Sequence, residues 1–164
     1  MNKPSARAAV HGTYIQRNWD LTEKRLQETQ SAANRALGLN PDEVQALWAL
    51  GYLLLKQGAL AQSEENLRRA AVLAPRDNRI VRSLSIVLLL RGQIDEARRL
   101  LEAAVARDPR DVLVRYDLAT TYASYNGDGA DSASLARALE QLDAAIAVQP
   151  LGSTLLLKAI LLGG

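Results

Sequence analysis

The sequence has 164 residues, no cysteine, one histidine and a formal net charge of +2. A chain of this length can bury roughly 70% of the surface that its unfolded form exposes, which is enough for one ordinary domain. The absence of cysteine excludes disulfides, thiolate zinc sites and a cysteine nucleophile. The apolar runs fall short of the roughly 20 residues that a membrane-spanning helix needs, so no membrane span is predicted.

The N-terminal part shows little regular pattern before residue 13. Residues 1–12 have basic side chains but no apolar segment behind them, which predicts a flexible arm and no secretory signal. The lone histidine, His11, lies in this arm and is expected to be solvated. Residues 13–41 contain one stretch with helical spacing, but Tyr14 to Asp20 lack the Leu-Gly pair of the later units. Residues 13–41 are therefore predicted to form a degenerate repeat or an N-terminal cap.

From Pro41 onward the chain repeats itself with a period of 34 residues. When the sequence is shifted by this period, the positions that coincide include Pro41, Pro75 and Pro109; Leu50, Leu84 and Leu118; Gly58 and Gly92; and Ala36, Ala70 and Ala104. Such a period indicates supersecondary units that must stack on one another to bury their apolar sides. The predicted units are 42–75, 76–109 and 110–150.

Each unit is predicted to contain two helices with recognisable ends. Leu47, Leu50 and Leu54 fall at i, i+3 and i+7, which is the spacing of one helical stripe. Gly58 lies between the two helices, where a left-handed cap costs least for a residue without a Cβ. Pro75 stops the second helix because it lacks an amide hydrogen, and the aspartate of Pro-Arg-Asp is expected to cap the next helix.

The third unit is longer than the others. Pro150 follows Pro109 by 41 residues, so seven residues have been added to the period. The Asn- and Gly-rich stretch near 126–134 is the predicted loop that takes them. This stretch is not predicted to bind calcium, because Arg137 stands where a calcium loop needs a glutamate.

After Pro150, residues 151–164 contain only a first helix, which is predicted to be part of a truncated repeat or a C-terminal cap. Its only charge is Lys158, whereas repeat arrays normally close with a helix that is polar on its outer face. Either the array continues in a longer protein, or the apolar edge packs on a second copy or a partner. Leu156 and Ile160 are the predicted self-association residues.

The repeated pattern resembles that of the tetratricopeptide repeat (TPR) family. The matching residues are Leu47, Leu50, Gly51, Leu54, Gly58, Leu67, Ala70 and Pro75, and then Val81, Leu84, Leu88, Gly92, Ala97, Leu101, Ala104 and Pro109. The resemblance implies an all-α fold, a right-handed superhelical array of antiparallel helix pairs (a TPR-like α-solenoid). About three to four repeats with degenerate ends are expected. It also implies a concave groove lined by the first helices of the units.

The side of each first helix opposite the apolar stripe is expected to face this groove. The predicted partner-binding residues are Gln45, Trp48, Tyr52, Lys56, Arg79, Arg82, Ile86, Leu89, Tyr116 and Thr120. Trp48 is expected to be an exposed aromatic anchor, and the alternative is that it packs at the hairpin junction. The mixed apolar and arginine composition favours a protein or peptide segment with apolar and acidic residues.

The residue types favour protein binding over catalysis. With one histidine and no cysteine, the chain has no support for a Ser-His-Asp arrangement or a multi-histidine metal site, and neither an enzyme nor a cofactor or metal site is predicted. The predicted function is a non-enzymatic interaction module or scaffold. By analogy with TPR proteins of similar composition, a bacterial assembly, secretion or envelope complex is expected.

Two other classes of function remain alternatives. The first is a structural protein that forms homo-oligomers through its apolar C-terminal helix. The second is a nucleic-acid-binding repeat, motivated by eight arginines between Arg79 and Arg115. It is disfavoured because basic groups are not interleaved with groove aromatics in every unit. The compartment is undetermined, with the cytoplasm as the default and the periplasm as the alternative if an export signal precedes this sequence.

Overall fold

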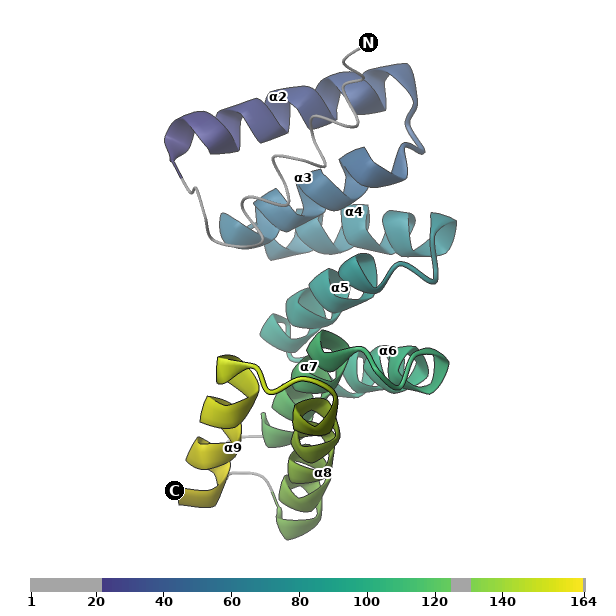
Figure 1. The fold of residues 1–164 in the computed structure, drawn as a ribbon. Helices are drawn as coiled ribbons and strands as arrows, with labels where there is room; N and C mark the ends of the chain where they lie inside the picture. Colours follow the sequence, from purple (N-terminus) through teal and green to yellow (C-terminus); the bar gives the residue numbers. More distant parts are fainter. Residues whose placement is uncertain (1–21, 125–130, 164) are drawn as a thin grey trace. The chain divides into compact units, whose positions relative to one another are not determined.

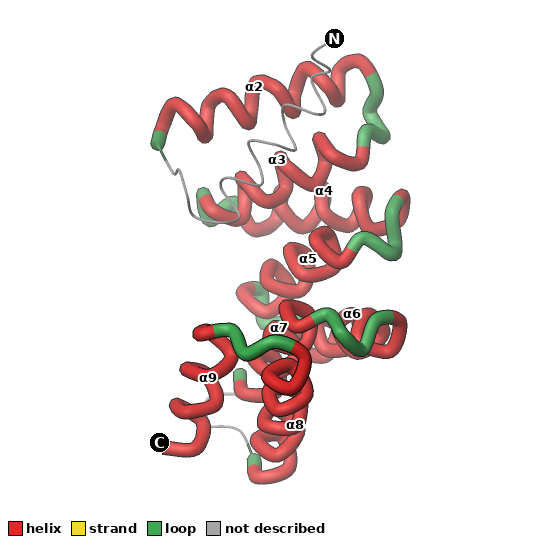
Figure 2. The backbone as a smooth tube through the Cα atoms, viewed as in Figure 1, coloured by secondary structure: helices red, strands yellow, loops and turns green. Residues whose placement is uncertain are grey.

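Helices make up all the regular structure of the computed structural model, which describes residues 22–124 and 131–163. In chain order they are α2 (Glu23–Leu39), α3 (Val44–Lys56), α4 (Leu60–Leu73), α5 (Asn78–Leu90), α6 (Ile94–Arg107), α7 (Val112–Ala123), α8 (Ser132–Val148) and α9 (Gly152–Gly163) (Figure 1). Short connections join successive helices from α2 to α7 (Figure 2). The all-α fold predicted from the sequence is confirmed.

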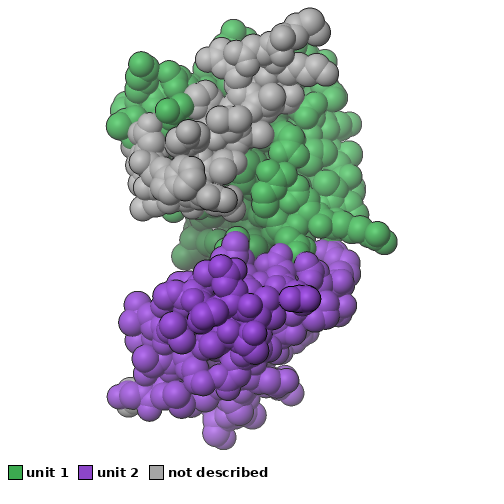
Figure 3. Space-filling view, viewed as in Figure 1, with its two compact units in different colours: residues 1–91 green, residues 92–164 purple. Residues whose placement is uncertain are grey.

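The chain divides into two compact units, Met1–Arg91 and Gly92–Gly164, named unit 1 and unit 2 below (Figure 3). Some of the predictions concern residues outside the described ranges. These are the N-terminal arm 1–12 with His11, the first part of segment 13–41, and most of the predicted loop near 126–134.

In unit 1, neighbouring helices approach closely through small residues. α2 packs on α3, α3 on α4, and α4 on α5. Gly51 of α3 is in contact with α4, because a Cβ added there would lie 2.6 Å from the Cγ of Leu67. The buried Ser63 hydroxyl of α4 donates a hydrogen bond of 2.6 Å to the Gly51 carbonyl oxygen. The Leu-Gly pair of the repeat pattern therefore allows α3 and α4 to pack at short distance.

The helix ends follow the signals found in the sequence. Gly58 and Gly92 have φ angles of 77° and 75°, the left-handed conformation predicted for them. Asp77 and Asp111 accept hydrogen bonds of 3.0–3.1 Å from backbone N–H groups in the first turns of α5 and α7. Pro75 follows the end of α4 by two residues. The Pro-Arg-Asp sequence thus ends one helix and caps the next, as predicted.

In unit 2, the predicted loop ends three residues later than the structure places it. The loop was expected to reach residue 134, but α8 begins at Ser132. Asp131 caps it, accepting a hydrogen bond of 2.6 Å from the Ser134 backbone N–H. Since α8 has 17 residues and α4 and α6 have 14 each, part of the insertion lengthens the helix.

Three helices of unit 2, α6, α7 and α8, meet around Tyr122 of α7. Its hydroxyl group donates a hydrogen bond of 2.6 Å to Glu102 of α6. The guanidinium groups of Arg98 on α6 and Arg137 on α8 lie 5.1 and 5.8 Å from the ring centroid. Burial and the Glu102 carboxylate raise the pKa of Tyr122 above its ordinary value of 10.0. One buried side chain therefore connects α6, α7 and α8.

The lengths and compositions of the helices also bear on the membrane question. No helix within residues 22–124 and 131–163 is both long enough and apolar enough to cross a bilayer.

Candidate protein-binding surface

The predicted partner-binding residues belong to three helices. Those on α3 and α5 lie in unit 1, where these two helices contact each other. Those on α7, Tyr116 and Thr120, lie in unit 2. The members on α3 and α5 that remain accessible to solvent define what is called the α3–α5 surface below, and they are Gln45, Lys56, Arg79, Arg82, Ile86 and Leu89.

Trp48 is not the exposed anchor that the sequence analysis expected. Its side chain is fully buried, with 0% exposure. The indole Nε1–H donates a hydrogen bond of 3.2 Å to Ser83 Oγ on α5, and the Ser83 hydroxyl donates one of 2.8 Å to the Arg79 carbonyl oxygen. The Arg79 guanidinium lies 4.9 Å from the centre of the ring. Trp48 therefore connects α3 to α5 beneath the surface.

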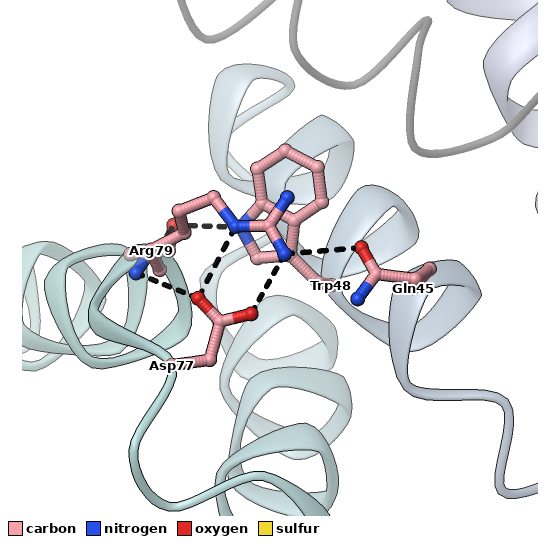
Figure 4. Close-up of polar contacts among 5 residues, drawn as sticks. Gln45, Trp48, Asp77 and Arg79 are labelled. Atoms are coloured by element: carbon pink, nitrogen blue, oxygen red, sulfur yellow. Dashed lines mark hydrogen bonds and ion pairs between the residues drawn. The ribbon is translucent and has the colours of Figure 1, made fainter. Parts of the chain in front are cut away.

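Arg79 is held by two neighbouring side chains (Figure 4). Its Nε and Nη2 donate hydrogen bonds to the two carboxylate oxygens of Asp77 at 3.2 and 2.7 Å. Nη2 also donates to Gln45 Oε1 on α3 at 3.2 Å. Although burial by itself raises the pKa of Asp77, the hydrogen bonds and charge of Arg79 outweigh it and keep the pKa below 3.8. These contacts fix the orientation of the guanidinium group.

Tyr52 continues the aromatic side of α3 and is also buried, with 6% exposure. Its ring stacks on that of Trp48 with centroids 6.3 Å apart, and it forms a buried cluster with Leu53 against which Leu26 packs. The ammonium group of Lys56, one turn further along, lies 5.5 Å from the Tyr52 ring centroid. Tyr52 was predicted to face the groove, but like Trp48 it is buried. Both aromatic side chains of α3 therefore lie beneath the surface.

The accessible apolar side chains are on α5. Ile86 and Leu89 are half-buried, and Leu90 at the end of the helix is 61% exposed. Arg82 and Ile86 are four residues apart and so lie on the same side of the helix. The α3–α5 surface thus combines apolar side chains on α5 with a fixed polar group at the start of α5.

Two residues that hold this surface in place, Asp77 and the buried Ser83, were not among the predicted site residues. Asp77 was identified only as a helix cap, although its place two residues before Arg79 is a local signal for the pair. Ser83 gives no such signal, because it lies 35 residues from Trp48 in the sequence.

The remaining predicted residues lie in unit 2. Tyr116 and Thr120 are half-buried, and the Thr120 hydroxyl donates a hydrogen bond of 3.0 Å to the Tyr116 carbonyl oxygen. On α9, Leu156 is 63% and Ile160 58% exposed. The single charge of this helix, Lys158, pairs with an aspartate of α8. The outer side of α9 is therefore uncharged.

The described residues offer little for metal chemistry. No group of three or more histidine, aspartate or glutamate side chains in 22–124 and 131–163 could hold a metal ion. The chemistry that the α3–α5 surface supports is hydrogen bonding, apolar contact and charge interaction through Lys56 and Arg82.

Two family models with the description "Tetratricopeptide repeat" match the chain, one over residues 24–78 and the other over residues 79–121. None of the curated proteins compared with the chain matches it.

Several solved structures share the fold. The structure titled "Functional Characterization of Pseudomonas Aeruginosa pilF" has a TM-score of 0.78 and 19% identity, covering 98% of this chain and 68% of that one. MamA from Desulfovibrio magneticus RS-1 has a TM-score of 0.71 and 17% identity, covering 98% and 84%. YrrB, described as "a TPR protein with an unusual peptide-binding site", has a TM-score of 0.68 and 24% identity, covering 90% and 70%.

Proposed function

Since the chain belongs to the tetratricopeptide repeat family, we propose that it is a non-enzymatic scaffold that binds a segment of a partner protein on the α3–α5 surface. The observation that carries this proposal is the pair of half-buried apolar residues Ile86 and Leu89, which lie on the helix that also carries the fixed Arg79 group. Apolar side chains that remain accessible beside fixed polar groups are typical of binding sites. The peptide-binding site named for YrrB is in keeping with the proposal.

The setting that we propose is a bacterial assembly, secretion or envelope complex. It is supported by the presence of Pseudomonas aeruginosa and Desulfovibrio magneticus proteins among the similar structures. The partner segment is proposed to be largely apolar, in keeping with the α5 side chains.

A capture experiment with matched variants tests the binding surface. The variant Ile86→Glu with Leu89→Glu places two charges on the α3–α5 surface, and Val72→Glu places one on α4, where Val72 is 80% exposed. Proteins retained from a lysate of the source organism are identified by mass spectrometry. We expect a protein that wild type and Val72→Glu retain and that the double variant loses, while circular dichroism shows all three to be folded. Equal capture by the three proteins contradicts the proposal.

A second candidate function is self-assembly through α9. The observation in its favour is the uncharged outer side of this helix, on which Leu155, Leu156, Ile160 and Leu162 are 47–64% exposed. Self-assembly predicts that the mass measured in solution is above that of one chain. This mass should fall when Leu156 and Ile160 are both replaced by glutamate. A monomer at every concentration, measured by sedimentation equilibrium, excludes it.

A further inference from the structure

The fixed group at the start of α5 carries almost no net charge. Asp77 contacts Arg79 through both carboxylate oxygens, with a shortest N···O distance of 2.7 Å. The pKa of Asp77 is held below 3.8, so the carboxylate is ionised at neutral pH. One negative and one positive charge therefore cancel at the place where the sequence analysis expected an arginine to attract an acidic partner.

Hydrogen-bond donors remain in this group after its internal contacts are made. The Nε–H and both Nη2–H groups of Arg79 are directed at Asp77 and Gln45. Its Nη1 has two more N–H donors, which meet no acceptor among the described residues, and the side chain is 43% exposed. Gln45 accepts from Arg79 through Oε1, and its amide Nε2, which has no acceptor within 22–124 and 131–163, is a further donor on the same surface.

These donors are held in place before any partner arrives. The guanidinium group lies on the buried Trp48 ring at 4.9 Å, and the ring is anchored by its hydrogen bond to Ser83. Asp77 is itself fixed as the cap of α5. Side chains that are already ordered lose little conformational entropy when they bind a ligand, so their hydrogen bonds contribute more to affinity.

We propose that Arg79 and Gln45 bind main-chain carbonyl oxygens of an extended partner segment that is uncharged where it meets these two side chains, an inference that rests on the proposed function of the α3–α5 surface. A carboxylate of the partner would gain little at this place, because it would be attracted by Arg79 and repelled by Asp77. A neutral carbonyl oxygen accepts the available N–H groups without that repulsion. Ile86 and Leu89, further along α5, supply the apolar contacts for the side chains of the segment.

Peptide selection on two forms of the protein tests this charge balance. A random peptide library is displayed on phage and selected on wild type and on Asp77→Asn, since asparagine caps a helix as well as aspartate but carries no charge. Lys56 and Arg82 are present in both forms, so the prediction concerns the difference between them. Peptides selected on wild type are expected to contain fewer aspartate and glutamate residues than those selected on Asp77→Asn, and their affinities are expected to change less between low and high salt. Peptides selected on Asp77→Asn are expected to be enriched in acidic residues, with affinities that fall about fivefold over the same range.

The carbonyl contact is tested by replacing each amide of a wild-type-selected peptide in turn with an ester, whose carbonyl oxygen is a poorer acceptor. We expect one or two positions at which the ester weakens binding to wild type about fivefold. The same esters should have little effect on binding to Arg79→Met, because the two changes remove the same hydrogen bond. If the esters at these positions weaken binding to wild type and to Arg79→Met equally, the proposal is contradicted.

The remaining outcomes separate this inference from the proposed function. Wild-type peptides that are as acidic and as salt-sensitive as those selected on Asp77→Asn would overturn the inference while leaving the α3–α5 surface as the binding site. Peptides that bind the Ile86→Glu, Leu89→Glu variant as well as wild type, or no selected peptide at all, would contradict the proposed function itself.

Discussion

Trp48 shows how far a repeat pattern predicts the environment of one side chain. The pattern correctly places Leu47 in the buried stripe of α3. It does not predict that Trp48, one residue later, is also buried, because the acceptor for its indole N–H is Ser83 on another helix. Trp48 and Ser83 lie 35 residues apart in the sequence, and their contact depends on which residue stands at each position. The 34-residue period does not fix the residue type at either position.

Replacing Trp48 by alanine is expected to destabilise the protein by about 3–5 kcal/mol, the usual cost of removing a large buried aromatic side chain. Trp48→Phe is the matched control, since it keeps an aromatic ring and loses the hydrogen bond to Ser83 and part of the buried volume, at a smaller cost of about 2 kcal/mol. Urea denaturation measures both changes in the free energy of unfolding. A change below about 1 kcal/mol for Trp48→Ala would mean that the side chain is not buried in solution.

At the scale of helices, the ends are predicted well where one residue type has a strong backbone preference. Proline, glycine and aspartate mark the ends of α4 and the start of α5 correctly. The start of α8 is predicted poorly, because Ser132, Ala133 and Ser134 have a composition common in loops, whereas the Asp131 cap makes them the first turn of a helix. Residues such as serine are found both in loops and in first turns, so composition alone does not separate the two.

Three glycines that have free space around them test the left-handed caps. No atom lies within 4 Å of a Cβ added at Gly38, Gly58 or Gly92, so packing is not a factor at any of them. Alanine at Gly58 or Gly92 is expected to destabilise the protein by about 1–2 kcal/mol, because φ is positive there. Alanine at Gly38, inside α2, is expected to stabilise by about 0.5–1 kcal/mol. Thermal melts of the three variants measure this difference, and melting temperatures that all shift in one direction would contradict it.

The ion pair at the start of α5 predicts a dependence of stability on pH. Since the folded-state pKa of Asp77 lies below 3.8, the stability it contributes is fully present above pH 3.8 and is lost as the pH falls through the lower folded value. The free energy of unfolding of wild type minus that of Asp77→Asn should therefore be constant near neutral pH and decrease on acidification below 3.8. Urea denaturation over a series of pH values gives this difference, which stays constant throughout if Asp77 is not paired with Arg79.

For the whole molecule, the period of 34 residues is sufficient to predict the family and the fold class. Each unit has an apolar side that only a neighbouring unit can cover, and few architectures satisfy this requirement. The binding surface is less predictable, because its residues occupy positions that stacking does not constrain. Of the eight residues proposed on α3 and α5, six are accessible, and the two that are not, Trp48 and Tyr52, are its aromatic members.

Hydrogen exchange of the whole chain, followed by mass spectrometry with and without a captured or selected partner segment, tests the proposed binding surface most directly. A segment bound on the α3–α5 surface should slow amide exchange in α3 and α5 of wild type, and the Ile86→Glu, Leu89→Glu variant should show no such slowing. Slowed exchange that is confined to α9, or that persists in the variant, would contradict binding at this surface.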